Sequence, residues 1–159
     1  MPRIVPNLWF DTQAEEAANF YVSLFPNSKI GTVARYSEAA AKASGRPAGS
    51  AMTVTFELDG QPFMALNGGP MFQFSEAISF VVNCETQAEI DRYWSELTSG
   101  GGQEGPCGWL KDRFGLSWQI VPTALGQLMK GPHADRVMAT LLQMKKLDIA
   151  ALQAAAEED

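Results

Sequence analysis

The sequence predicts an α+β protein with two βαβββ modules and a C-terminal helical tail. A twelve-residue block occurs twice, as IVPNLWFDTQAE (4–15) and as ISFVVNCETQAE (78–89). The two copies align without a gap at an offset of 74 positions, the distance between their threonines (86 − 12). In both copies an extended apolar run leads into the same Thr-Gln-Ala-Glu helix start, and further extended segments follow the helix. We therefore expect one duplicated domain over 1–159, with module one at about 3–70, module two at about 76–122 and the helical tail at about 123–156.

Each threonine of the repeat is expected to begin a helix. In a capping box, the threonine hydroxyl accepts a hydrogen bond from the third backbone N–H, and the glutamate three residues later reaches back. Thr12 and Thr86 are therefore predicted as equivalent N-caps, while Pro26 and Gly100 end the two helices. Apolar residues recur at helical spacing, so each helix is expected to pack on a sheet. They are Ala17, Phe20, Tyr21 and Leu24 in the first helix, and Ile90, Tyr93, Trp94 and Leu97 in the second.

The remaining strands of each module are predicted after its helix. In module one they lie near 29–37, 51–58 and 61–67, and Asp59-Gly60 is the turn between the last two. In module two they lie near 103–106, 107–112 and 116–121. Residues 38–50 are expected to form a mobile surface loop.

The helical tail has no counterpart in the first module. One or two helical turns are predicted soon after Thr123. A longer helix follows, with Val137, Leu141 and Met144 in one apolar stripe. Asp148 is expected to cap a short final helix.

Composition excludes several classes of function. A net charge of −6 and a pI near 4.8 argue against a nucleic-acid partner, which needs clustered Lys and Arg. There is no apolar run of 18 residues and no signal-peptide pattern at the start, so we expect no membrane partner and a cytoplasmic location. Cys84 and Cys107 are then reduced thiols. His133 is the only histidine, which excludes a site with two or three histidine ligands within one chain.

Four segments resemble the PhnB-like family of the vicinal oxygen chelate (glyoxalase/bleomycin resistance/dioxygenase) superfamily. They are NLWFDTQAEEAANFYVSLFPNSKI, FELDGQPFMALNGGP, SFVVNCETQAEIDRYW and CGWLKDRFGLSWQIVP, and the resemblance extends over nearly the whole chain, tail included. It implies that the modules form a U-shaped mixed sheet whose concave face holds a ligand, often around a divalent metal. Members often carry the label 3-demethylubiquinone-9 3-methyltransferase. That activity fits poorly, because the sequence lacks a glycine-rich strand-to-helix loop for S-adenosylmethionine.

The resemblance also implies four metal-ligand positions, which fall on Val5, Ala65, Ser79 and Gln119 of this chain. Val5 and Ser79 are equivalent in the repeat, and Ala65 matches Gln119 when FMAL is aligned with SWQI. Metal-dependent relatives carry a glutamate where this chain has Gln119. Two of the four side chains are apolar and the other two are neutral, so we predict no metal and no cofactor in this cleft.

Strand alternation then predicts which residues line the concave face. Asn7 and Trp9 are expected there, with Leu8 and Phe10 packed against the helices. The predicted ligand-binding residues are Asn7, Trp9, Asn67, Ser79 and Gln119, among Phe63, Val81 and Val121. The alternative is that the polar residues satisfy buried backbone groups and that Trp9 fills the core.

No catalytic group emerges from the sequence, so whether the chain is an enzyme stays open. His133 is expected at the surface or at a helix start, and the two cysteines as inert thiols. Asp112 and Arg113 are expected at a hairpin turn, solvated or as a surface pair.

The leading hypothesis is a homodimeric small-molecule-binding protein with a non-metal cleft. Its ligand is expected to be neutral or weakly polar, because no Lys or Arg lies on the strand positions assigned to the cleft. Two alternatives are a metal-dependent lyase, isomerase or dioxygenase of the same superfamily, and a drug-sequestering resistance protein.

Overall fold

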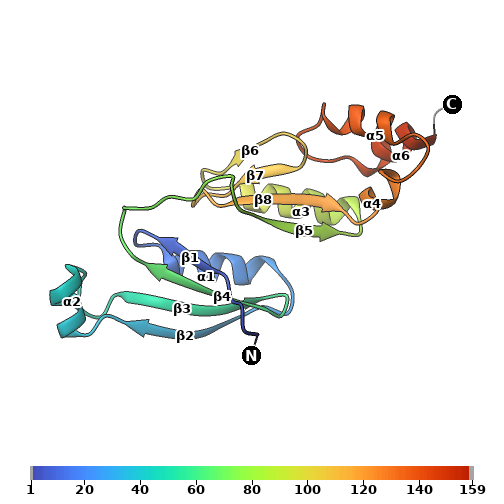
Figure 1. Ribbon diagram of the computed structural model, residues 1–159. Helices are drawn as coiled ribbons and strands as arrows, with labels where there is room; N and C mark the ends of the chain where they lie inside the picture. Colours follow the sequence, from blue (N-terminus) through green and yellow to red (C-terminus); the bar gives the residue numbers. More distant parts are fainter. Residues whose placement is uncertain (1, 158–159) are drawn as a thin grey trace. The chain divides into compact units, whose positions relative to one another are not determined.

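The computed structural model describes residues 2–157, and the chain divides into two compact units with the boundary between Gln73 and Phe74. Each unit contains one four-stranded mixed sheet and one helix packed on it (Figure 1). The predicted α+β class, the two βαβββ modules and the helical tail are confirmed. That the two units make up a single domain stays a prediction.

The first unit follows the predicted order of elements, with one additional helix. Its sheet has the order β1-β4-β3-β2, in which β1 pairs with β4 in parallel and the other neighbours are antiparallel. The predicted turn between β3 and β4 is present, with φ of 49° at Asp59 and 79° at Gly60. The elements are β1 (Asn7–Phe10), α1 (Ala14–Leu24), β2 (Lys29–Arg35), α2 (Glu38–Ser44), β3 (Ala51–Leu58) and β4 (Gln61–Asn67).

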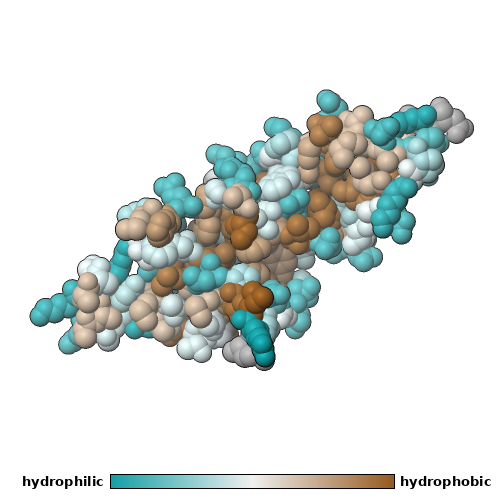
Figure 2. All heavy atoms as spheres, in the orientation of Figure 1, coloured by the Kyte–Doolittle hydropathy of each residue, from teal (hydrophilic) through white to brown (hydrophobic). Residues whose placement is uncertain are grey.

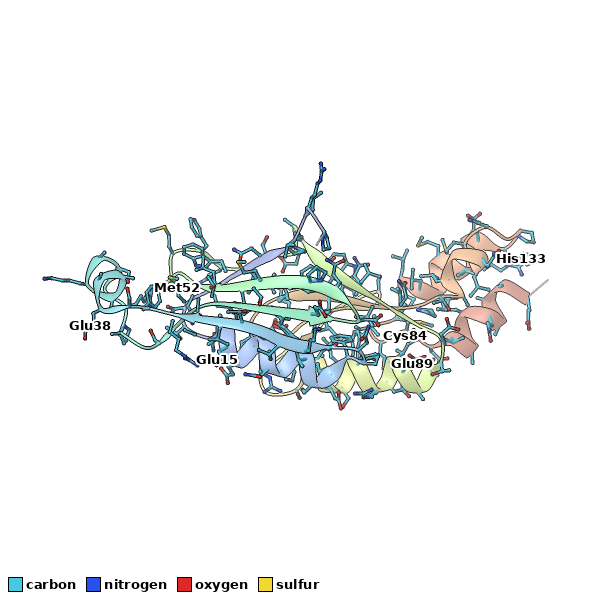
Figure 3. The ribbon with its side chains drawn as sticks, turned by 90° about the horizontal axis from the view of Figure 1, so that it is seen from below. Glu15, Glu38, Met52, Cys84, Glu89 and His133 are labelled. Carbon is cyan, nitrogen blue, oxygen red and sulfur yellow. The ribbon has the colours of Figure 1, made fainter. Side chains whose placement is uncertain are left out.

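Helix α1 covers one face of this sheet (Figure 3). Its buried side includes Ala17, Tyr21 and Leu24, as the apolar spacing predicts, whereas Phe20 of the predicted set is only half-buried. The ring of Tyr21 lies beside that of Phe56, with centroids 6.5 Å apart, and Phe56 stacks on Phe63 with centroids 5.4 Å apart. Burying such side chains contributes about 1.5–3 kcal/mol each, so this layer holds the helix on the sheet.

The prediction of a loop over residues 38–50 is partly wrong, because its first half is helix α2. Ser37 caps this helix by accepting a hydrogen bond from the Ala40 N–H at 3.1 Å, and Gly45 ends it. The sequence EAAAKAS favours a helix through its alanines, which sequence reasoning overlooked. No residue of α2 is buried, so the segment does lie at the surface.

The second unit repeats the arrangement and adds the tail. Its sheet has the order β5-β8-β7-β6, again with a parallel pair formed by the first and last strands. The elements are β5 (Ser79–Cys84), α3 (Gln87–Thr98), β6 (Gln103–Glu104), β7 (Trp109–Lys111), β8 (Ser117–Pro122), α4 (Leu125–Leu128), α5 (Ala134–Leu141) and α6 (Ile149–Glu157).

The capping box predicted for the second repeat is confirmed. The Thr86 hydroxyl accepts a hydrogen bond from the Glu89 N–H at 3.2 Å, and the Glu89 carboxylate accepts from the Thr86 N–H at 3.2 Å. Figure 3 labels Glu89 in the first turn of α3 and Cys84 at the end of β5. All four predicted apolar residues of α3 are buried: Ile90, Tyr93, Trp94 and Leu97.

The first repeat does not carry the equivalent cap, so the prediction for Thr12 is wrong. Helix α1 begins after Gln13, and its start has no cap from a neighbouring side chain. Instead the Ala14 N–H donates to Oδ1 of Asn67, at 2.8 Å, from the end of β4. A side chain distant in sequence therefore replaces the local cap.

The tail packs on itself and on the second sheet. Val137, Leu147, Leu152 and Ala155 form its buried core, with Leu141 and Met144 packed against them. The predicted cap of the last helix is confirmed, because the Ala151 N–H donates to Asp148 at 3.0 Å. Figure 2 shows hydrophobic residues at the surface of the tail among hydrophilic ones. Within residues 2–157, no helix has the length and apolar character needed to cross a membrane.

Candidate functional site

The face of each sheet that lies away from its helix, called here the open face, is where sequence reasoning placed the ligand. In β1, Leu8 and Phe10 are buried, and Asn7 and Trp9 occupy the other face. This matches the predicted alternation.

In β4 the predicted face is wrong. Ala65 and Asn67 are buried on the helix side, and Met64 and Leu66 are the more exposed positions. The register agrees, because Met64 lies opposite Asn7 and Leu66 lies opposite Trp9. A slip of one residue exchanges the two faces of a strand, so every β4 residue assigned to the cleft was placed on the wrong side.

Asn67 therefore has a structural role within the first unit. It is 7% exposed, and its carboxamide accepts from the Ala14 N–H at 2.8 Å and donates to the Ala51 carbonyl at 3.0 Å. The Tyr36 hydroxyl donates to the Asn67 backbone carbonyl at 2.8 Å. Asn67 joins β4, β3 and α1, as the alternative role of satisfying buried backbone groups describes.

The turn glycines carried a signal that would have given the correct register. Gly60 and Gly115 both adopt positive φ, 79° and 88°, in the turn just before the last strand of each module. They differ by 55 positions (115 − 60), which makes Met64 the structural counterpart of Gln119. The pairing confirms this, since Asn7 faces Met64 and its repeat equivalent Val81 faces Gln119.

The second open face brings Ser79 and Gln119 together. Nε2 of Gln119 donates to the Ser79 hydroxyl at 3.0 Å, and both residues are half-buried. Trp109 of β7 lies opposite Gln119 on the other side, so an indole adjoins the amide. Val81, on the same face, is 52% exposed. The predicted neutral polar pair therefore lies beside apolar surface.

Trp9 lies on the first open face but is held by the following loop. Its indole N–H donates to the Gly69 carbonyl at 2.9 Å, and its ring meets Phe72 edge-on with centroids 4.9 Å apart. A side chain at Gly68 would collide with the ring, with the nearest atom at 2.2 Å. Trp9 thus anchors residues 68–72 over the open face.

Sequence reasoning missed two residues of the second open face. Lys111 and Ser117 form a cross-strand pair, and Ser117 also lies beside Ser79. Ser117 is 1% exposed, and within residues 2–157 its hydroxyl has no hydrogen-bond partner. Both line a hollow of about 240 Å³ together with Glu76, which forms an ion pair with Lys111.

A second hollow, of about 350 Å³, lies in the first unit near the start of α1. Its cations are occupied, because Arg35 pairs with Glu15 at 3.2 Å and Arg46 pairs with Asp11 at 3.6 Å. Unlike the hollow beside Ser117, it contains no buried side-chain oxygen or nitrogen without a hydrogen-bond partner among residues 2–157.

The remaining candidates have structural roles. Burial, with the Glu89 carboxylate adding to it, raises the pKa of the Cys84 thiol to about 11, so the thiol is neutral near pH 7. His133 lies at the start of α5, as expected, without capping it through its side chain. Asp112 was expected at the surface, but it is buried and accepts from the backbone N–H of Phe114 and from the indole N–H of Trp118.

The four positions implied by the resemblance do not fit a divalent ion. Val5 offers no donor, and neither Ala65 nor its correctly registered replacement Met64 offers a hard one. Ser79 and Gln119 are neutral and bonded to each other. No group of three or more His, Cys, Asp or Glu residues that could hold a metal occurs anywhere in residues 2–157.

Comparisons with known proteins agree with this fold. The model of the 3-demethylubiquinone-9 3-methyltransferase family matches residues 2–121, so the match ends before the tail, to which the resemblance was expected to extend. A putative 3-demethylubiquinone-9 3-methyltransferase, PhnB protein, from Bacillus cereus is 35% identical, with a TM-score of 0.67 and coverage of 77% of this chain and 100% of that one.

Two more distant structures share the fold alone. Protein PA1353 from Pseudomonas aeruginosa is 21% identical, with a TM-score of 0.60 and coverage of 77% of this chain and 98% of that one. The fosfomycin resistance protein FosX from Listeria monocytogenes is 11% identical, with a TM-score of 0.51 and coverage of 80% and 97%. A search of curated proteins found no match.

Proposed function

Because the chain belongs to the 3-demethylubiquinone-9 3-methyltransferase (PhnB-like) family and has the glyoxalase/bleomycin resistance fold, we propose that it binds a small organic molecule without a metal ion. The observation that carries this proposal is the hydrogen bond of 3.0 Å between Gln119 and Ser79 on the second open face. Two neutral side chains bonded to each other occupy positions at which metal-dependent members of the superfamily carry metal-coordinating residues.

The amide of Gln119 retains capacity for a ligand. A glutamine side chain offers two donor hydrogens and one acceptor oxygen, and the bond to Ser79 uses one donor. A ligand carbonyl and a ligand N–H or O–H can therefore both be recognised at Gln119. Trp109 and Val81 supply apolar surface for the body of the ligand.

The expectation of a neutral or weakly polar ligand needs a correction. It rested on the absence of Lys and Arg from the strand positions of the cleft, but Lys111 lies on the same face as Ser117 and Gln119. We keep the proposal of a neutral contact at Gln119, where the partners are uncharged. Asn7 and Trp9 lie on the open face of the first unit and stay separate candidates for ligand contact there, whereas Asn67 lies on the helix side and is no longer a candidate.

A ligand screen with one pair of variants tests the proposal. A library of small organic compounds is scanned by thermal shift, and each hit is titrated calorimetrically into wild type, Gln119→Ala and Gln153→Ala. Gln153 is an exposed glutamine of α6, so its variant is the matched control. Loss of Gln119 should weaken binding by about 1–3 kcal/mol, because a ligand group is left unpaired.

The control should bind like wild type. Equal affinities of all three proteins for every hit would mean that Gln119 belongs to the fold and that the ligand binds elsewhere.

We also propose that the protein is a cytoplasmic homodimer. Both cysteines are free thiols, which suits a reducing compartment. Ile78 and Val81 are exposed by 59% and 52% in the second unit, and burial against a second copy would remove this apolar surface from water. Sedimentation velocity at micromolar concentration tests the assembly, and a single species of 17.3 kDa would contradict it.

A further inference from the structure

The hollow beside β7 and β8 suggests the charge of the ligand. We propose that Lys111 and Ser117 bind a carboxylate group of a small ligand, and that Glu76 occupies this place until the ligand displaces it. This inference rests on the proposed function, because it assigns a chemical class to one end of the same open face.

The first argument is the Ser117 hydroxyl. It is buried, it lines the hollow, and within residues 2–157 it has no hydrogen-bond partner. A buried hydroxyl without a partner is costly, because it has lost its hydrogen bonds to water without gaining others. An acceptor that enters the hollow would relieve this cost, since a serine hydroxyl can donate one hydrogen bond.

The second argument is the ion pair between Lys111 and Glu76. Lys111 lies directly across from Ser117, so its ammonium group and the hydroxyl border the same hollow. The carboxylate of Glu76 already forms an ion pair with this ammonium group, so a carboxylate fits beside Lys111 at this end of the hollow. The hydrogen bond from Lys111 also holds the pKa of Glu76 below its ordinary value of 4.5, so Glu76 is ionised near pH 7.

The pair is weak enough to exchange. The side chains of Lys111 and Glu76 are 39% and 60% exposed, and exposed ion pairs contribute little to stability. A ligand carboxylate that contacts both the ammonium group and the buried hydroxyl makes a bond to Ser117 that Glu76 does not make in the structure. Such charge-assisted hydrogen bonds are about twice as strong as neutral ones.

The size and lining of the hollow limit the ligand. About 240 Å³ is below the ~300–1,000 Å³ of pockets for drug-sized ligands, so the bound part is small. Trp109 lines the hollow and offers a flat apolar surface. A short aromatic or aliphatic body with one carboxylate fits both features.

Benzoate is the probe, with benzamide as its neutral counterpart and inorganic phosphate as an anion without an apolar body. Each is titrated calorimetrically at pH 7.5 into wild type, Lys111→Met, Ser117→Ala, Glu76→Gln and Lys29→Met. Lys29 pairs with Glu57 at 3.7 Å in the first unit, so its variant removes a similar surface lysine away from the hollow.

Benzoate should bind wild type more tightly than benzamide or phosphate does. Lys111→Met should weaken benzoate binding about tenfold or more, and Ser117→Ala should weaken it several-fold, because each removes a donor to the carboxylate. Glu76→Gln should strengthen binding, since the competing carboxylate is gone. Lys29→Met should bind like wild type.

The inference is overturned if benzoate fails to bind, if benzamide binds equally well, or if Glu76→Gln weakens binding. Tighter binding of phosphate than of benzoate would also overturn it, because the hollow would then select charge alone. In each case the proposed function stands as long as hits of the wider screen still depend on Gln119. It fails separately if no hit depends on that residue.

Discussion

Replacing Asn67 with alanine should destabilise the first unit strongly. The substitution removes the acceptor for the Ala14 N–H and the donor to the Ala51 carbonyl, at 2.8 and 3.0 Å. Both bonds are buried, so neither backbone group gains water in exchange. Each buried group left unpaired costs about 1–3 kcal/mol, and the two together about 2–6 kcal/mol. That is a large share of the ~5–15 kcal/mol that stabilises an ordinary domain.

Urea unfolding followed by circular dichroism measures this loss as a lower midpoint of the transition. Asn83→Ala is the matched control, because Asn83 is an exposed asparagine on β5. The control should change the free energy of unfolding by less than about 0.5 kcal/mol. If Asn67→Ala unfolded at the same urea concentration as the control, the role of Asn67 in holding α1 would be refuted. Loss of ligand binding without loss of stability would instead favour the original assignment of Asn67 to the cleft.

Thr86→Ala should lower the free energy of unfolding by about 0.5–2 kcal/mol, whereas Thr12→Ala should leave it nearly unchanged, because only Thr86 caps a helix; equal losses in urea unfolding would contradict this. Maleimide at pH 7.5 should label one thiol of the native protein, Cys107, and two after denaturation, since Cys84 is buried and neutral. Folding raises the pKa of the Cys84 thiol from 9.0 to about 11, so the contribution of this thiol to the free energy of unfolding is complete below pH 9 and is lost as the pH rises through 11. A free energy of unfolding that increased between pH 9 and 11 in wild type, relative to Cys84→Ser, would contradict the raised pKa. Zn²⁺, Ni²⁺, Mn²⁺ and Fe²⁺ should not raise the melting temperature, although an ion at a hundred times its Kd would add about 2.7 kcal/mol; a shift that disappears in Gln119→Ala would reveal a metal site after all.

The parts of the fold that sequence reasoning predicted correctly depend on local chemistry. The Thr86–Glu89 capping box needs only residues within one turn, and the Asp59-Gly60 turn needs only two residues that tolerate positive φ. The two faces of β1 were predicted correctly, because the polar Asn7 among apolar neighbours indicates which face lies away from the helix.

The error in β4 arose because the two faces of this strand are alike. In β4, Phe63 and Ala65 alternate with Met64 and Leu66, so apolar character does not reveal which pair faces the helix. The pairing with β1 and β3 decides between the two registers in the structure, and in the sequence only the offset between the turn glycines Gly60 and Gly115 indicated the correct one.

The candidate site was predicted only in part. Ser79 and Gln119 were assigned to the cleft because the resemblance placed both at metal-ligand positions, but the hydrogen bond between them was not predicted. Lys111 was missed because it lies near the end of a short strand, where alternation over three residues indicates little. The burial of the Ser117 hydroxyl depends on its neighbours across the sheet, which the sequence does not disclose.

The different starts of α1 and α3 bear on the order of folding. Helix α3 is capped by Thr86, which bonds to Glu89 only three positions further along the chain. The first turn of α3 can therefore form as soon as this short segment has been synthesised. Helix α1 depends on a bond that spans 53 residues, and closing so long a loop costs chain entropy before any contact rewards it. During synthesis, we expect the first turn of α1 to gain this bond only after β4 has left the ribosome. In refolding experiments, substitutions at Thr86 should then slow folding, whereas substitutions at Asn67 should chiefly speed unfolding.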